Sequence, residues 1–138
     1  MSKKINLFVV DDEAGFRELM VKVIPRTKYH LEVFSNGREV LKAIEKKEFD
    51  VGLIDIEMPD MDGIELLREF RKQDILTEFI ILTGHGSVST AIESMKLGCY
   101  DYLTKPTRLG ELEAVIQKAY EKKGYQERKH YFKRRTTD

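Results

Sequence analysis

Apolar and polar residues follow two periods that alternate along the chain. Short apolar stretches, which are typical of buried strands, occupy residues 5–10, 29–35, 50–55, 78–84 and 99–106. After each stretch, apolar residues recur at spacings of three and four, as on one face of a helix; these faces include Phe16, Val40, Ile64, Val88 and Leu109. Five strands that alternate with five helices predict parallel βαβ units, whose helices cover both faces of one sheet.

Two residues mark helix ends in this pattern. Asn36 stands directly before the second helical face, where its side chain can cap the first turn. Gly98 follows the fourth helical face, at a position where glycine commonly ends a helix. The links between the predicted strands and helices are only a few residues long, which is typical of an alternating α/β domain.

The composition is that of an ordinary globular domain. Of the 138 residues, 41% are hydrophobic and 35% are charged, and 24 Lys and Arg balance 24 Asp and Glu. Cys99 is the only cysteine, so no internal disulfide can form. No apolar run approaches the roughly 18 residues of a membrane span, and the N-terminal sequence does not resemble a signal peptide. We therefore expect a cytoplasmic protein without a membrane partner.

The balanced total conceals a basic C-terminal end. From Lys118 onward the chain has eight Lys or Arg against three acids, whereas residues 1–117 carry an excess of acids. We place one domain at residues 1–122 and a basic helix extension or tail at 123–138. Its mixture of aromatic and cationic side chains is conceivable in a nucleic-acid contact, but a solvated helix end is the commoner case. We do not expect nucleic acid among the partners.

Polar groups with related chemistry follow four of the predicted strands, and they are Asp11, Asp12 and Glu13, then Asp55, then Thr83, then Lys105. In an open parallel sheet, ligands bind beyond the carboxyl ends of the strands, so these groups converge if the four strands are neighbours. Carboxylates bind Mg²⁺, and a carboxylate can also attack phosphorus. A lysine and a hydroxyl can hold phosphoryl oxygens. The set therefore indicates phosphoryl transfer at one edge of the sheet.

Each of these groups also has a plainer structural interpretation. The acidic run at 11–13 could satisfy the dipole at a helix N-terminus, and Asp55 could belong to an ordinary turn. Thr83 could form part of a turn with the glycine that follows it, and Lys105 could be a solvated side chain. The hypothesis of a site rests on the combination of four separate segments at equivalent strand ends.

Four segments carry a resemblance to a known family: "FVVDDE" (8–13), "DIEMPDMDG" (55–63), "ILTGHG" (81–86) and "DYLTKP" (101–106). With them the sequence resembles the receiver domain of bacterial two-component response regulators, over about residues 4–120. It looks most like receivers of regulators that activate sigma-54-dependent transcription. The resemblance implies a flavodoxin-like, doubly wound α/β fold, in which five helices flank a five-stranded parallel sheet in the order 2-1-3-4-5.

The resemblance also implies roles for the matching residues. Asp55 would be the phosphoacceptor, and Lys105 would pair with a phosphoryl oxygen. Thr83 would be the switch hydroxyl that turns toward the phosphoryl group, and Tyr102 would be the aromatic side chain that moves inward with it.

A divalent cation and two tuning positions complete the implied site. Mg²⁺, or Mn²⁺, would bind Asp11, Asp12, the Asp55 carboxylate and the backbone carbonyl of Glu57. The side chains of Glu57 and His85 occupy positions that tune the lifetime of the acyl phosphate in this family. Both could instead be solvated loop residues.

The implied function is that of a signalling switch. A sensor histidine kinase or a phosphotransfer protein would phosphorylate it, and the surface formed by the fourth helix, fifth strand and fifth helix would change. That surface would then control a partner or the formation of a homodimer. Such a domain is not an enzyme in the usual sense, because it catalyses only its own phosphoryl transfer and autodephosphorylation.

Other functions remain as alternatives at this stage. An aspartyl-phosphate phosphohydrolase of the haloacid-dehalogenase type expects its nucleophile after the first strand, in a DxDx[TV] pattern that residues 11–15, "DDEAG", do not match. An unphosphorylated scaffold is disfavoured because all the key positions are present. A nucleotide-binding domain would need a Gly-rich first turn. No phosphate loop or helix-turn-helix can be placed in the remaining residues, so the sequence is either a stand-alone receiver or an excised domain; we expect the former.

Overall fold

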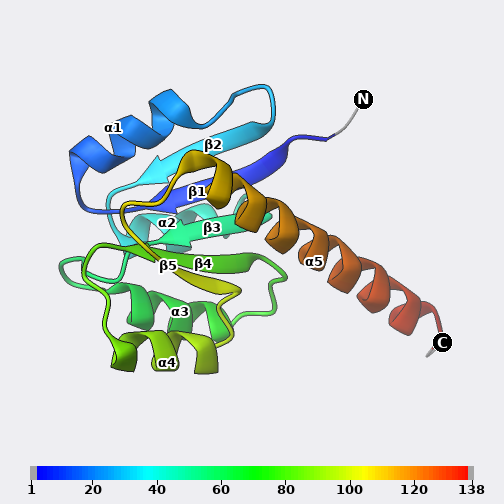
Figure 1. Cartoon of the computed structure of the whole chain (residues 1–138). Helices are drawn as coiled ribbons and strands as arrows, with labels where there is room; N and C mark the ends of the chain where they lie inside the picture. The colour runs from blue at the N-terminus through cyan, green and yellow to red at the C-terminus, as the bar shows by residue number, and fades with distance from the viewer. Residues whose placement is uncertain (1–2, 137–138) are drawn as a thin grey trace.

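The computed structural model describes residues 3–136, which form one parallel sheet with helices on both of its faces (Figure 1). The strands are β1 (Ile5–Val10), β2 (Tyr29–Phe34), β3 (Val51–Ile54), β4 (Glu78–Thr83) and β5 (Asp101–Thr104). The helices are α1 (Ala14–Val23), α2 (Gly37–Ala43), α3 (Gly63–Arg71), α4 (Val88–Lys96) and α5 (Leu109–Thr136). The strands and helices alternate along the chain, as the apolar periodicity predicts.

The order of the strands is β2-β1-β3-β4-β5, and every neighbouring pair is parallel. The predicted fold is therefore confirmed. In the register, Val10 of β1 lies beside Phe34 of β2 and Ile54 of β3, so these three strands end at the same level. β3 and β4 are buried along their whole length, in keeping with the apolar residues of β3 and of the middle of β4, Phe79 to Leu82.

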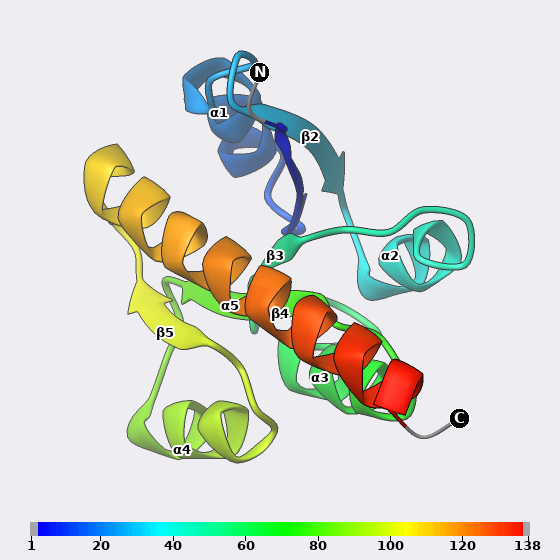
Figure 2. The same ribbon diagram turned by 90° about the vertical axis from the view of Figure 1, so that its right-hand side faces the viewer.

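The sheet separates two apolar clusters. One cluster packs α2 and α3 against it, and its largest buried members include Phe8, Phe49, Leu66, Phe70 and Phe79. The other packs α1 and α5 against the opposite face, through residues such as Leu7, Met20, Leu53, Leu112 and Ile116. Figure 2 shows α1 and α5 on one side of the strands, and α2, α3 and α4 on the other. Right-handed crossovers between parallel strands produce this two-sided arrangement.

The predicted helix ends at Asn36 and Gly98 are both present. The Asn36 side chain accepts a hydrogen bond from the backbone N–H of Glu39 at 3.0 Å, so it caps α2. Gly98 follows α4 and has a φ of 84°, a left-handed conformation that glycine adopts without steric cost.

The last strand is shorter than its predicted extent. β5 spans four residues rather than the predicted 99–106, because Cys99 and Tyr100 only lead into it from the turn at Leu97 and Gly98, and a bend follows it at residues 105–106. α5 continues without a break to Thr136, past residue 122, where we placed the end of the domain. In Figure 1 its C-terminal turns extend past the amino ends of the strands. No helix within the described residues is long and apolar enough to cross a membrane.

Candidate functional site

Three carboxylates meet at the carboxyl ends of β1 and β3. The N–H of Asp11 bonds to the carbonyl of Phe34, and the N–H of Asp55 bonds to the carbonyl of Val10, so both residues are still held by the sheet. One carboxylate oxygen from each of Asp11, Asp12 and Asp55 lies within 4.8 Å of the others. Asp11 and Asp55 are buried, with 1% and 2% exposure, whereas Asp12 is open to solvent.

The Asp55 carboxylate is only half satisfied. The hydroxyl of Thr83 donates a hydrogen bond of 2.6 Å to its Oδ1, but its buried Oδ2 has no hydrogen-bond partner within the described chain. Burial raises the pKa of Asp55 above its usual value. The Thr83 bond opposes this increase, Asp11 adds to it, and Lys105 and the backbone N–H of Ile56 oppose it. A buried carboxylate with a free oxygen is costly unless a cation or an incoming group meets it.

Lys105 supplies the positive charge of the site. Its Nζ donates a hydrogen bond of 2.6 Å to Oδ2 of Asp11 and lies 3.9 Å from a carboxylate oxygen of Glu13. Its backbone N–H bonds to the carbonyl of Thr83 at 2.8 Å, which ties the end of β5 to the end of β4. The lysine side chain is 17% exposed, so its charge acts in a partly desolvated position.

The loop after Asp55 approaches the site through a glycine. A Cβ atom at Gly63 would lie 2.4 Å from the carbonyl oxygen of Asp55, which is closer than any real contact of this kind. The Gly63 N–H bonds to the carbonyl of Ile56 at 2.8 Å. α3 therefore begins directly against the backbone of Asp55, at a position that only glycine can occupy without a shift of its neighbours.

Thr83 and Tyr102 lie on neighbouring strands, but they bond to different groups. The hydroxyl of Thr83 faces Asp55 and also accepts the backbone N–H of His85 at 3.2 Å. Tyr102 is half-buried against the α2–α3 cluster, and its hydroxyl lies 2.9 Å from that of Thr90 in α4. The sequence analysis did not identify Thr90 as a partner of Tyr102. The only indication was that Thr90 lies in the first turn of the helix that follows Thr83.

Glu57 and His85 come together from two loops. The Nδ1 atom of His85 lies 3.0 Å from a carboxylate oxygen of Glu57, and both side chains are more than half exposed. The family resemblance implied that both residues act on the acyl phosphate, but it did not predict their contact with each other. Glu57 follows Asp55 by two positions along the chain, and His85 follows Thr83 by two.

The donor set fits a hard divalent cation. Mg²⁺ prefers carboxylate and water oxygens, and it usually takes only one or two protein carboxylates directly. Asp11, Asp12 and Asp55 provide this chemistry, and the unpartnered Oδ2 of Asp55 is a buried acceptor without a donor. These residues could therefore hold Mg²⁺ or Mn²⁺.

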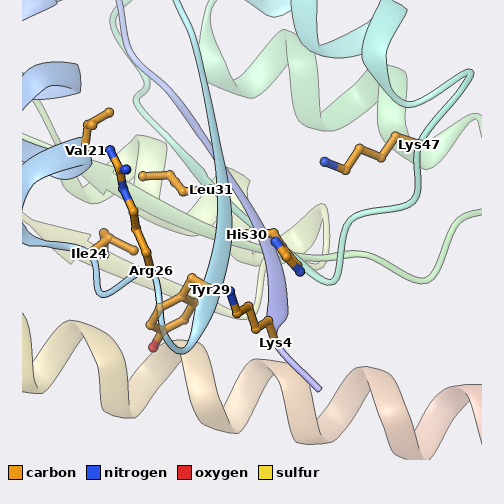
Figure 3. Close-up of a pocket in the computed structure, with 8 residues that line it drawn as sticks. All are labelled: Lys4, Val21, Ile24, Arg26, Tyr29, His30, Leu31 and Lys47. Carbon is orange, nitrogen blue, oxygen red and sulfur yellow. The ribbon is translucent and has the colours of Figure 1, made fainter. Parts of the chain in front are cut away.

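A separate cavity of about 400 Å³ lies at the other end of the sheet (Figure 3). Its lining consists of Lys4, Val21, Ile24, Arg26, Tyr29, His30, Leu31 and Lys47. These residues come from the start of β2 and from the elements around it, whereas the carboxylates follow the ends of β1 and β3. The cavity therefore takes no part in chemistry at Asp55.

The open sheet, the helices on both faces and a polar site beyond the carboxyl ends of the strands define a flavodoxin-like α/β domain. Comparison with protein families makes the assignment more specific: the response regulator receiver domain matches residues 7–117. The chain therefore belongs to the response regulator receiver domain family, and the predicted resemblance is confirmed.

Curated relatives agree with this assignment. The DNA-binding transcriptional regulator NtrC of Proteus hauseri is 37% identical over 117 residues, which are 85% of this chain and 25% of NtrC. The regulatory protein AtoC of Escherichia coli is 35% identical over 113 residues, 82% of this chain and 24% of AtoC. These matches confirm the predicted likeness to receivers of sigma-54-dependent activators. The chain spans only about a quarter of the length of either relative.

Solved structures agree as well. A CheY-like receiver domain protein from Methanospirillum hungatei has a TM-score of 0.84 and 26% identity, over 90% of this chain and 99% of that one. The receiver domain of the Francisella response regulator 1452 has a TM-score of 0.78 and 35% identity, over 86% and 98% of the two chains. The relatives are response regulators rather than conventional enzymes.

Proposed function

We propose that this receiver domain is a phosphorylation-dependent signalling switch, with Asp55 as the phosphoacceptor. The observation that carries the proposal is the state of the Asp55 carboxylate. One of its oxygens accepts the Thr83 hydroxyl at 2.6 Å, and the other is buried without a partner. The ammonium of Lys105 donates a hydrogen bond to the neighbouring carboxylate, that of Asp11. The site thus combines a carboxylate oxygen without a partner, a hydroxyl on the other oxygen of the same carboxylate, and an ammonium on the neighbouring carboxylate.

The chemical step is a transfer to a carboxylate. A carboxylate oxygen of Asp55 attacks the phosphorus of a phosphohistidine, a new O–P bond forms, and the N–P bond breaks. The electron pair of that bond returns to the imidazole nitrogen of the donor. Lys105 and Thr83 would bind the oxygens of the arriving group.

Asp11, Asp12, Asp55 and the backbone carbonyl of Glu57 would hold the divalent cation. When bound, Mg²⁺ neutralises the negative charge that builds up between the phosphoryl oxygens and the carboxylates. The burial of Asp11 fixes the direction of one of these ligands, and the exposure of Asp12 leaves room for water.

Phosphorylation would reach the surface through Thr83, Tyr102 and α4. A phosphoryl group on Asp55 competes for the Thr83 hydroxyl, and the loop from Thr83 leads directly to α4. The Tyr102 hydroxyl contacts Thr90 at the start of that helix, so a shift of the loop changes this contact. A local charge would therefore bias a two-state surface.

The exposed face of α4 supports an output at this surface. Val88, Ile92 and Met95 are 78%, 52% and 53% exposed, which is unusual for three apolar side chains on one helix. The proposed partner upstream is a sensor histidine kinase or a phosphotransfer protein. The proposed output is a partner protein or a homodimer through α4, β5 and α5, in the cytoplasm. Residues 1–122 would form the receiver, and 123–138 a basic extension.

The test is the intact mass of the protein after incubation with acetyl phosphate and Mg²⁺. Wild type should gain about 80 Da, the mass of one phosphoryl group on a carboxylate. Asp55→Asn should gain nothing, and a chelator should abolish the gain in wild type. Asp60→Asn is a matched control, because Asp60 lies in the following loop and should remain dispensable.

The same experiment can contradict the proposal. An equal mass gain in Asp55→Asn would move the phosphoacceptor elsewhere. If wild type gains no mass from acetyl phosphate, from a panel of phosphorylated histidine kinases or from phosphotransfer proteins, the switch hypothesis fails.

A further inference from the structure

The ammonium of Lys105 lies between carboxylates and an aromatic ring, since Glu13 is 3.9 Å away and two closer contacts hold it. Asp11 accepts its hydrogen bond at 2.6 Å, and on another side Nζ lies 3.8 Å from the centroid of the Phe16 ring. A cation over the face of an aromatic ring is attracted by the negative charge of that face, and more strongly where water is partly excluded. With 17% of the lysine side chain exposed, that condition holds here.

The position of the Phe16 ring is itself fixed by its surroundings. It lies in the first turn of α1, which begins immediately after the acidic run, and its ring packs against the α1–α5 cluster. The Arg17 side chain beside it donates a hydrogen bond of 2.7 Å to the carbonyl of Asp11, which ties the start of α1 to the end of β1. The ring is therefore fixed relative to the end of β1, which Asp11 follows directly.

We infer that Phe16 is a positioning residue, whose ring face holds the Lys105 ammonium beside Asp55 for phosphoryl transfer. A lysine side chain has four rotatable methylene groups and loses considerable freedom when it is held in one place. The ring removes part of that freedom before the phosphoryl group arrives. Leucine would fill a similar volume, but it lacks the π-electron face that attracts a cation. The proposed role of Phe16 therefore requires an aromatic ring and not only an apolar side chain.

The two restraints on Lys105 differ in how they respond to a divalent cation. The charge of Asp11 is shared once its carboxylate binds a cation, so its hold on the ammonium weakens. The ring of Phe16 carries no net charge and keeps its contact. Phe16 therefore matters most in the cation-loaded protein, where repulsion between the two positive charges would otherwise drive Lys105 outward.

Three variants test this inference, which rests on the proposed function only for its kinetic consequence. Phe16→Leu removes the aromatic face, Phe16→Tyr keeps it, and Val23→Ala disturbs the same face of α1 seven residues away. Urea unfolding checks that each protein folds. The first measurement is the NMR shift of the Lys105 ε-methylene protons in metal-free, unphosphorylated protein, because protons above a ring are shifted upfield.

We expect the upfield shift in wild type, Phe16→Tyr and Val23→Ala, and its loss in Phe16→Leu. The second measurement is the rate of phosphorylation by acetyl phosphate with saturating Mg²⁺. Phe16→Leu should slow it about five-fold, the size expected for one moderately desolvated cation–π contact. Phe16→Tyr should restore the rate to within about two-fold of wild type, since a tyrosine ring binds cations comparably.

Two outcomes would overturn the inference. Lys105 protons that do not respond to Phe16→Leu would show that the ring does not hold the ammonium in solution. Equal slowing in Phe16→Leu, Phe16→Tyr and Val23→Ala would show a role in packing alone. If wild type cannot be phosphorylated at all, the proposed function fails, while the NMR shift still decides whether Phe16 holds Lys105.

Discussion

At the scale of single residues, the cost of burying Asp55 explains much of the site. A carboxylate with 2% exposure and a free oxygen is unfavourable in the resting protein. Its raised pKa expresses the same cost, since burial favours the neutral acid. This cost keeps one anionic oxygen of Asp55 unpartnered, within electrostatic reach of Lys105.

We predict that Asp55→Asn stabilises the protein. The amide is neutral and its oxygen can still accept the Thr83 hydroxyl, so the free energy of unfolding should rise by about 1–2 kcal/mol at neutral pH without divalent cations. Because the folded-state pKa of Asp55 lies above its unfolded value, the cost is present above the folded pKa and is relieved as pH falls. Urea unfolding at neutral and mildly acidic pH should show the advantage of Asn shrinking as pH falls. A less stable Asp55→Asn at neutral pH would contradict this account.

Glu57 and His85 allow a second prediction at this scale. Their side chains meet at 3.0 Å and are both more than half exposed, so we expect them to contact the water that hydrolyses the acyl phosphate. Either Glu57→Ala or His85→Ala should change the dephosphorylation rate measured by decay of radiolabelled protein. Lys96→Ala, on the last turn of α4, serves as a surface control. Unchanged decay in both loop variants would remove the idea.

At the scale of elements, glycines show where the backbone is constrained and where it is not. At Gly63 a Cβ would meet the Asp55 carbonyl at 2.4 Å, and the first turn of α3 cannot easily move away because its neighbours are buried. Gly124 lies inside α5, and the nearest atom to its Cβ would be the end of the flexible Arg128 side chain at 3.5 Å.

The same substitution should therefore have opposite effects at these two positions. Gly124→Ala should increase the free energy of unfolding by about 0.5–1 kcal/mol, the usual gain of alanine over glycine inside a helix. Gly63→Ala should decrease it by about 1–3 kcal/mol through overpacking. Thermal unfolding of both variants, followed by circular dichroism, checks the signs. A stabilising Gly63→Ala would show that the loop after Asp55 is free to move.

At the scale of the whole molecule, one buried lysine connects α5 to the amino end of the sheet. Lys123 is 3% exposed, and its Nζ donates hydrogen bonds to Glu127 at 2.7 Å, Asp50 at 3.0 Å and Glu48 at 3.2 Å. Asp50 also accepts the backbone N–H of Asn6 in β1 at 2.8 Å. The contact therefore ties α5, at the position where it leaves the sheet, to β1 and to the start of β3.

Lys123→Met should destabilise the domain by about 2–4 kcal/mol, because it leaves the half-buried Asp50 without its cation. Burial alone would lower the pKa of Lys123, but its bonds to Glu127 and Asp50 outweigh this and raise it. A raised lysine pKa contributes stability that is complete below the unfolded value, about 10.4, and is lost as pH rises through the folded value. The deficit of the variant in urea unfolding should therefore stay constant from neutral pH to about pH 9 and shrink only above the unfolded value. Lys129→Met, on the exposed side of α5, should change little.

Local patterns in the sequence were sufficient for the fold and for most of the candidate site. The βαβ alternation, the Asn36 cap and the polar residues at the strand ends depend on neighbours within a few positions. Parallel topology then brings Asp11, Asp55, Thr83 and Lys105 to one edge without further information. In contrast, the basic composition of the C-terminal end predicted a solvated helix end that includes Lys123, whereas Lys123 is buried. A count of charges cannot distinguish a buried cation from a solvated one.

What the sequence by itself determined is the order of elements, the family and the identity of the acidic and basic groups at the strand ends. Only the tertiary structure decided which of these groups touch: Lys105 rests on Asp11 and Phe16, Tyr102 bonds to Thr90, and one oxygen of Asp55 stays free. The physical reason is that periodicity and turn chemistry act over short distances along the chain. Side-chain contacts across the sheet depend on register, burial and rotamer, which are fixed only when distant segments pack together.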